Sequence, residues 1–322
     1  MSLRRPLLLV GAALALTACG ASQAPSSATA VRVGGDWGRF GYDAARSNSG
    51  PARTGITAAR VGKLRRQQVR LPGTVDSSPI YLRAVRVRGR AHDVFLVTTS
   101  YGITLAVDAR SGSILWRFKP RGYSSWAGSE RITNSTPVAD PNRRFVYAAA
   151  PDGRIHKLVV ATGAEVRSGG WPVAITRLPG REKIAPALNY SRGLVLETTG
   201  GYIGDAPPYQ GHVLAVSARR GRIVHVWNAL CSDRHALISP SSCSESGAAI
   251  WARSGAVVVP KTGDLLVATG NARFDGRRSW GDSALMLSPN AGSLLHSWTP
   301  RNQAQLDNGD VDLGSTAPAV LG

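Results

Sequence analysis

The sequence lacks the motifs of several common enzyme classes. Its 322 residues contain no Walker-type phosphate loop, no HExxH zinc motif and no G-x-S-x-G nucleophile turn. Six histidines are present, and none has the spacing of metal ligands: His92, His156, His212, His225, His235 and His296. Nothing in the sequence therefore points to a nucleotide hydrolase, a zinc peptidase or an α/β hydrolase.

Lysine is scarce, although the net charge is +19. Of 39 basic residues only five are lysine, and the arginines are dispersed along the chain. The densest basic stretch, residues 83–90, has no interleaved aromatic residues on which nucleic-acid bases could stack. We therefore expect no nucleic-acid partner. The charge is typical of a solvated surface, with attraction to anionic lipid or a cell-envelope polymer as a secondary effect.

Cysteine is also scarce. Of the three cysteines, Cys231 and Cys243 lie in one short stretch, "CSDRHALISPSSC". In an exported protein this spacing predicts a disulfide, with two free thiols as the alternative. A metal site formed by the two cysteines with His235 is the less favoured interpretation, because a structural site needs four ligands and only three candidates are near.

Long apolar runs are confined to the start of the chain. Arg4 and Arg5 precede an apolar stretch, residues 6–16, that is too short to span a bilayer. The following "LTAC" resembles a bacterial lipobox, in which Cys19 receives lipid. The alternative is an ordinary secretory signal with an incidental cysteine. We expect residues 1–19 to be a lipoprotein signal peptide and residues 20–35 to be a flexible tether, giving an exported protein anchored on the extracytoplasmic face of a membrane.

Short β-prone segments separated by turns make up the rest of the chain. Residues 77–118 read as four strands joined by turns, which is the size of one propeller blade. A turn glycine recurs after the third strand of each such unit, at Gly112, Gly163, Gly221 and Gly292, and a proline recurs near the first strand, at Pro79, Pro137, Pro186 and Pro318. Their alternation favours stacked blades over a generic run of hairpins.

The repeats predict an all-β fold, a β-propeller of four-stranded antiparallel blades within residues 36–322. The expected blades cover about residues 77–118, 134–171, 185–228 and 247–298, and residues 312–322 would begin a further one. We expect an incomplete, open ring of about four blades from a longer reading frame. In the alternative, residues 315–321 pair with residues 63–71 and close a ring of five.

The repeat "AVDARSGSILWRF" resembles that of the pyrroloquinoline-quinone (PQQ) propellers, in which an Asp, a turn Gly and a Trp close each blade. Asp108, Gly112 and Trp116 match in full. Later copies keep only part of the pattern: Gly163, then Gly221 with Trp227, then Gly292 with Trp298. The opening segment "DWGRFGYDAARSNSG" is also similar to that of this family.

The family resemblance implies a candidate site in the last third of the chain. In the quinoprotein alcohol dehydrogenases of this family, a T-G-N asparagine helps to hold calcium and an aspartate before the next blade acts as base. Asn271 matches the first, and Asp310 or Asp312 stands where the second is expected. The family's adjacent cysteine pair is absent, and no glutamate matches the calcium ligand; Asp205 lies in that loop and Glu197 lies earlier.

These departures favour a binding or scaffold module for which no cofactor is expected and whose protein or cell-envelope partner is unknown. On this interpretation Asn271, Asp310 and Asp312 have structural roles. The alternative is a membrane-anchored alcohol dehydrogenase that uses PQQ and calcium.

Overall fold

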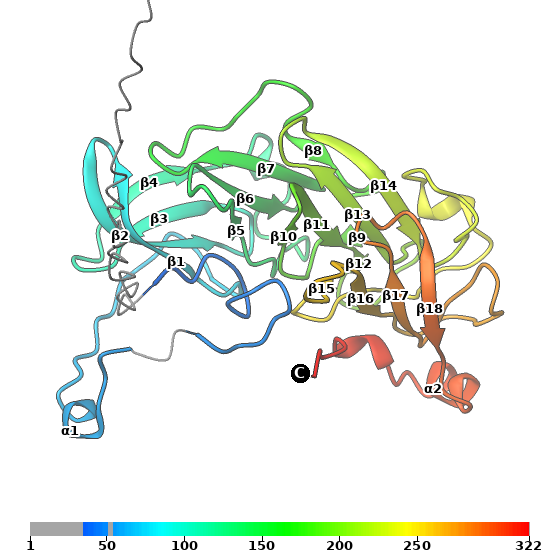
Figure 1. Ribbon diagram of the computed structural model, residues 1–322. Helices are drawn as coiled ribbons and strands as arrows, with labels where there is room; N and C mark the ends of the chain where they lie inside the picture. The colour runs from blue at the N-terminus through cyan, green and yellow to red at the C-terminus, as the bar shows by residue number, and fades with distance from the viewer. Residues whose placement is uncertain (1–34, 51–53, 322) are drawn as a thin grey trace, which may run out of the picture. The chain divides into compact units, whose positions relative to one another are not determined.

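The computed structural model describes residues 35–50 and 54–321, so the predicted signal peptide, Cys19 and most of the tether lie outside the described residues. The described chain is nearly all β (Figure 1). Its helices are short: α1 (Ala58–Val61), α2 (Gln303–Asn308) and the 3-10 turns η1 (Tyr123–Ser125), η2 (Pro240–Ser242) and η3 (Leu313–Ser315). Within these residues, no helix has the length and apolar character needed to cross a lipid bilayer.

Four four-stranded antiparallel sheets follow one another along the chain, which confirms the predicted fold class. The first comprises β1 (Ile80–Val87), β2 (Arg90–Thr98), β3 (Thr104–Asp108) and β4 (Ile114–Phe118). The second comprises β5 (Val138–Ala139), β6 (Phe145–Ala150), β7 (Arg154–Val159) and β8 (Val173–Ala174). In each, the strands pair in sequence order.

The third and fourth sheets repeat this order. The third comprises β10 (Asn189–Ser191), β11 (Leu194–Thr198), β13 (His212–Ser217) and β14 (Arg222–Asn228). The fourth comprises β15 (Val257–Val258), β16 (Leu265–Ala268), β17 (Ala284–Leu287) and β18 (Leu294–Trp298). A separate two-stranded ribbon joins β9 (Glu182–Lys183) to β12 (Gly200–Gly201).

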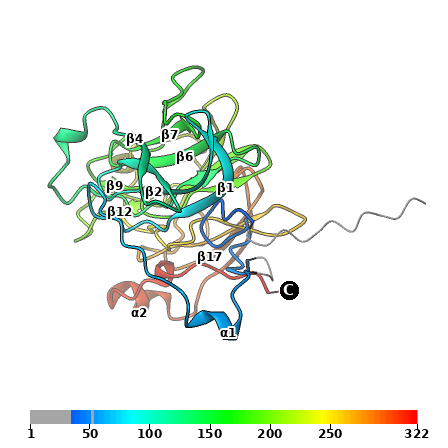
Figure 2. The same ribbon diagram turned by 90° about the vertical axis from the view of Figure 1, so that its left-hand side faces the viewer.

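Consecutive sheets bury their facing side chains against one another. One apolar cluster joins the first sheet to the second, another the second to the third, and another the third to the fourth. Figure 2, seen from the side of the first sheet, shows β6 and β7 of the second sheet close to β2 and β4. Each sheet thus covers the face that its neighbour could not bury alone.

The blade-closing tryptophan of the first sheet packs onto the turn glycine of the second. Trp116 Nε1 donates to the carbonyl oxygen of Val160 at 2.8 Å. Gly163 has a φ of 74°, and a Cβ there would lie 2.7 Å from Trp116 Cδ2. A side chain at this turn would both strain the backbone and collide with the indole.

The same contact recurs one sheet later with a residue that the sequence did not reveal. Gly221 takes a φ of 63°, and its Cβ would lie 2.7 Å from Trp171 Cδ1. In the sequence Trp171 is hidden because a longer loop separates it from Gly163. Trp227 is buried between the third and fourth sheets, whereas Trp298 is 60% exposed.

Residues 36–48, here called the strap segment, contact the first strand of every sheet. The hydrogen bonds join Trp37 to Tyr81 in β1, Gly38 to Ala139 in β5, Arg39 to Asn189 and Tyr190 in β10, and Ala44 to Val258 in β15. The buried Arg46 guanidinium then donates to the carbonyl oxygens of Ala187, Leu188 and Ser254, and burial lowers its pKa to about 9. The strap segment therefore ties the four first strands together (blue in Figure 1).

The first and fourth sheets are not joined by strand pairing. Val69 and Leu71 pack against the apolar face of the first sheet, and a Cβ on Gly112 would lie 2.6 Å from Val69 Cγ2. Residues 312–321, where a further blade was expected to begin, contain η3 and no strand. Across the described chain, residues 315–321 form no strand pairing with residues 63–71, as an open arrangement predicts.

Candidate functional site

A cavity of about 740 Å³ lies where the segments leading into the four first strands converge. The segment before each first strand contributes to the wall: Asp76 before β1, Asn134 with Ser129, Glu130 and Ile132 before β5, Lys183 of β9 before β10, and Trp251 before β15. We call this space the mouth cavity. Its size is within the range of pockets that bind small organic ligands.

The wall of the mouth cavity carries charges of both signs. Arg253 Nη2 lies 2.6 Å from Asp76 Oδ1, and Asn134 Nδ2 donates to Asp76 Oδ2. Burial lowers the pKa of Lys183, and the nearby Asp76 carboxylate opposes that shift. The wall therefore combines an indole, an amide and opposed charges, which suits recognition of a polar organic molecule.

The rim of the cavity is formed by the loop that follows β12. Tyr202, Ile203, Gly204 and Asp205 line the space, and the Ile203 side chain is 80% exposed. The Tyr202 hydroxyl donates to the carbonyl oxygen of Pro179 at 3.0 Å, which holds the base of the loop. Asp205, which the sequence analysis noted only for its place in this loop, thus lies on the cavity wall.

Asn271, Asp310 and Asp312, identified from the sequence, are brought together in the structure. The backbone N–H of Asn271 donates to Asp312 Oδ1 at 2.7 Å, and its Nδ2 donates to Asp310 Oδ1 at 2.9 Å. The remaining side-chain atom, Asn271 Oδ1, is buried and has no hydrogen-bond partner among the described residues. Burying an amide oxygen without a partner costs free energy. Because it has no partner, Asn271 Oδ1 can accept a hydrogen bond from a ligand or coordinate a cation.

The carboxyl groups of Asp310 and Asp312 interact electrostatically with Asp205, which lines the mouth cavity. Burial raises the pKa of Asp312, and the neighbouring Asp310 raises it further. Burial likewise raises the pKa of Asp205, with added repulsion from Asp312 and Asp310. The raised pKa values of Asp312 and Asp205 beside the Asp310 carboxyl group mean that this side of the cavity favours a bound positive charge.

The oxygen donors suit a hard cation such as Ca²⁺, but the protein set is incomplete by itself. In the described part of the chain, no three or more His, Cys, Asp and Glu side chains are grouped so that they could hold a metal ion. A cation here would need oxygen atoms from water or from a second ligand. Whether Asn271, Asp310 and Asp312 have purely structural roles stays a prediction.

Other residues discussed from the sequence lie outside the mouth cavity. Cys231 and Cys243 form the predicted disulfide, with their Cα atoms 6.1 Å apart, and neither lines the cavity. Glu197 is fully buried and accepts from the backbone N–H of Thr198, and burial raises its pKa well above the usual range. Glu197 is not among the residues that line the mouth cavity.

Four wall residues were not identified from the sequence, yet three of them occupy a repeated position. Asp76, Asn134 and Lys183 each stand three residues before the repeated proline of their sheet. Trp251 has no such marker, because Ser254 and not a proline stands three residues after it. Aligning the repeats on the proline instead of the glycine would have found the other three.

No protein-family model matches the sequence, and no curated protein does either. Solved structures do match. Quinohemoprotein alcohol dehydrogenase from Comamonas testosteroni has a TM-score of 0.62 at 20% identity, covering 84% of this chain and 42% of that one. Quinohemoprotein alcohol dehydrogenase ADHIIG from Pseudomonas putida HK5 has a TM-score of 0.63 at 18% identity, covering 82% and 40%.

A europium-containing methanol dehydrogenase is also similar, with a TM-score of 0.60 at 16% identity, covering 82% of this chain and 49% of that one. The chain thus spans less than half the length of each of these enzymes. At these identities the likeness concerns the fold alone. The chain has the PQQ-type β-propeller fold that these quinoprotein dehydrogenases share.

Proposed function

We propose that this chain is an exported, lipid-anchored propeller that acts as a binding or scaffold module and takes a small polar organic ligand in its mouth cavity. The observation that carries the proposal is that the leading segments of all four sheets contribute residues to the wall of a single cavity. Convergent polar groups beside an aromatic side chain are typical of ligand pockets. The anchor rests on the lipobox-like "LTAC" and Cys19.

The character of the wall indicates the ligand class. Trp251 offers an apolar ring surface, Lys183 offers a cation, and Asn134 offers an amide. Planar molecules stack on indole rings, and anionic groups pair with ammonium groups. A planar ligand with acidic substituents fits these three side chains.

A second candidate is the quinoprotein dehydrogenase activity, favoured by the unpaired Oδ1 of Asn271 next to two carboxyl groups. In that case Asn271 and Asp310 or Asp312 would provide oxygen ligands for Ca²⁺, and one of the two carboxylates would accept the proton of an alcohol. Bound PQQ would supply the hydride acceptor. The absence of an adjacent cysteine pair weighs against this candidate.

One titration separates the two functions. Purified full-length protein is titrated with PQQ, with and without Ca²⁺, while tryptophan fluorescence and quinone absorbance are followed; a dye-linked alcohol assay is run on the same samples. Binding without alcohol oxidation supports the binding module, and oxidation supports the dehydrogenase. If Lys183→Met and Trp251→Leu bind PQQ as well as the wild type, the mouth cavity is not the site.

A further inference from the structure

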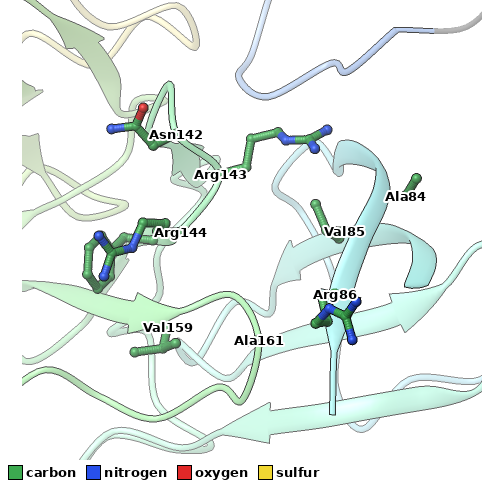
Figure 3. A pocket seen from close by; sticks show the side chains of 9 residues that line it. Ala84, Val85, Arg86, Asn142, Arg143, Arg144, Val159 and Ala161 are labelled. Atoms are coloured by element: carbon green, nitrogen blue, oxygen red, sulfur yellow. The ribbon is translucent and has the colours of Figure 1, made fainter. Parts of the chain in front are cut away.

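A second cavity, of about 540 Å³, lies between the first and second sheets (Figure 3). It shares no lining residue with the mouth cavity. We call it the arginine cleft. Its lining comes from β1, from the loop between β5 and β6, and from the end of β7 with the turn that follows. The lining residues are Ala84, Val85, Arg86, Asn142, Arg143, Arg144, Phe145, Val159 and Ala161.

The arginine cleft is lined by three guanidinium groups and by no carboxylate. The mouth cavity differs, since Asp76, Glu130 and Asp205 line it beside one lysine. Opposed charges at the mouth partly cancel, whereas positive charge in the arginine cleft has no counterpart in its own lining. This asymmetry favours an anionic occupant.

The three arginines differ in how they are held. Arg143 Nη1 lies 3.3 Å from Asp36 Oδ2 and donates to the carbonyl oxygen of Arg83 at 3.0 Å, so it is fixed between the strap segment and β1. Arg86 Nη1 donates to the carbonyl oxygen of Gly89 at 2.9 Å. The Arg144 guanidinium carbon lies 5.6 Å from the centre of the Phe145 ring.

Arg86 and Arg144 therefore keep free donors. Neither forms an ion pair with a carboxylate in the described part of the chain, and each side chain is exposed. The carbonyl and ring contacts orient the guanidinium groups without neutralising them. A guanidinium fork of this kind matches the oxygen atoms of a phosphate group in geometry and charge.

The floor of the arginine cleft is apolar. Val85 is buried, and Phe145, Val159 and Ala161 are half-buried around the same space. A free inorganic anion gains nothing from these side chains, whereas the carbon part of an ester would cover them. We propose that the arginine cleft binds the phosphate group of an organic phosphate ester, with the carbon part of the ester on the apolar floor.

Two sources carry this chemistry, a phospholipid headgroup and a soluble phosphate ester. The strap segment bears on the choice because Asp36 pairs with Arg143 at the cleft. The 16 residues between Cys19 and Asp36 allow the two to be at most about 60 Å apart when the segment is fully extended. A chain lipidated at Cys19 would thus keep the cleft within that distance of a membrane surface.

Isothermal titration calorimetry on the purified full-length protein in non-ionic detergent tests the proposal. The probes are inorganic phosphate, glycerol 3-phosphate and dihexanoyl phosphatidylglycerol. The test variant is Arg86→Gln with Arg144→Gln, and the matched control is Arg222→Gln with Arg301→Gln, which removes the same charge elsewhere. Thermal unfolding of both variants verifies that they remain folded.

We expect at least one ester to bind more tightly than inorganic phosphate, and the test variant to weaken that binding by about tenfold or more because two charged donors are lost. If phosphatidylglycerol binds most tightly, the ligand is a lipid headgroup. If glycerol 3-phosphate binds at least as tightly as phosphatidylglycerol, the ligand is a soluble ester. Equal affinity for all three probes, an equal loss in the control variant, or no binding by the wild type would overturn the proposal.

Discussion

Arg253 and Asp76 join the leading segments of the fourth and first sheets by a 2.6 Å ion pair at the mouth cavity. The two side chains are 52% and 43% exposed, so water screens the pair and its contribution to stability is below about 1 kcal/mol. Its effect is local. By holding the Asp76 carboxylate beside Asn134, the pair fixes one wall of the cavity without neutralising Lys183.

The contact between Trp116 and Gly163 provides the first prediction. Gly163→Ala should lower the free energy of unfolding by about 3 kcal/mol, because the new methyl group meets the indole at a position with positive φ. Gly89→Ala is the matched control: its φ is 84°, and no atom lies within 4 Å of its Cβ position. Urea unfolding measures both; equal losses would show that the sheets do not pack tightly here.

Repeats made most of the fold predictable. Gly112, Gly163 and the prolines before the first strands of three sheets are local requirements of turns and strand starts, so they are visible in the sequence. The packing of Trp171 against Gly221 was not predicted, because it depends on which residues face each other across the interface between two sheets. Packing partners that are distant in sequence leave no fixed spacing.

The site was predictable only in part, for the same reason. Asn271, Asp310 and Asp312 were found through their resemblance to a known pattern, and the structure places them in contact. The mouth cavity needed three-dimensional information, because its wall takes residues from the leading segments of all four sheets and from the loop after β12. The arginine cleft likewise depends on two sheets meeting, which the dispersed arginines of the sequence did not indicate.

The disulfide between Cys231 and Cys243 provides the second prediction. Replacing both cysteines with serine should lower stability by about 3 kcal/mol in the chain-entropy model, because the bond closes a short loop. Thermal unfolding of the wild type with and without reductant should reproduce the difference. Mass spectrometry of a non-reduced digest should show the linked peptides, and separately alkylated thiols in native protein would contradict the bond.

Lipidation of Cys19 is the third prediction, and it rests on the sequence alone. Cys19→Ala should abolish lipid attachment, because the Cys19 sulfur is the atom to which the lipid is attached. The variant protein should then be released or misprocessed. Detergent phase separation of expressing cells measures the change. Ser26→Ala, seven residues further on, is the control and should leave partition unaltered. Membrane partition that is unchanged by Cys19→Ala would refute the anchor.

The pH dependence of stability is the fourth prediction. Burial and Asp310 raise the pKa of Asp312, so this carboxyl keeps its proton in the folded state after the unfolded chain has lost it. The contribution of Asp312 to the stability of the wild type should then fall as pH rises above about 4, the usual carboxyl value. Asp312→Asn should therefore raise the melting temperature at neutral pH and have little effect near pH 3. A gain that is the same at both values would show that charge is not the cause.

The response to calcium is the last prediction, and it decides the role of the Asn271 cluster. If Asn271, Asp310 and Asp312 are structural, Ca²⁺ should leave the melting temperature of the wild type unchanged, because the described protein groups do not complete a metal site. The measurement is thermal unfolding with Ca²⁺ or with chelator, for the wild type, Asn271→Ala and the distant control Asn142→Ala. A rise in melting temperature that the wild type and the control show and that Asn271→Ala lacks would mean that Asn271 Oδ1, unpaired in the structure, accepts a cation. That result would favour the dehydrogenase proposal. A cation bound there would also offset the repulsion by Asp310 and Asp312 that raises the pKa of Asp205 at the mouth cavity.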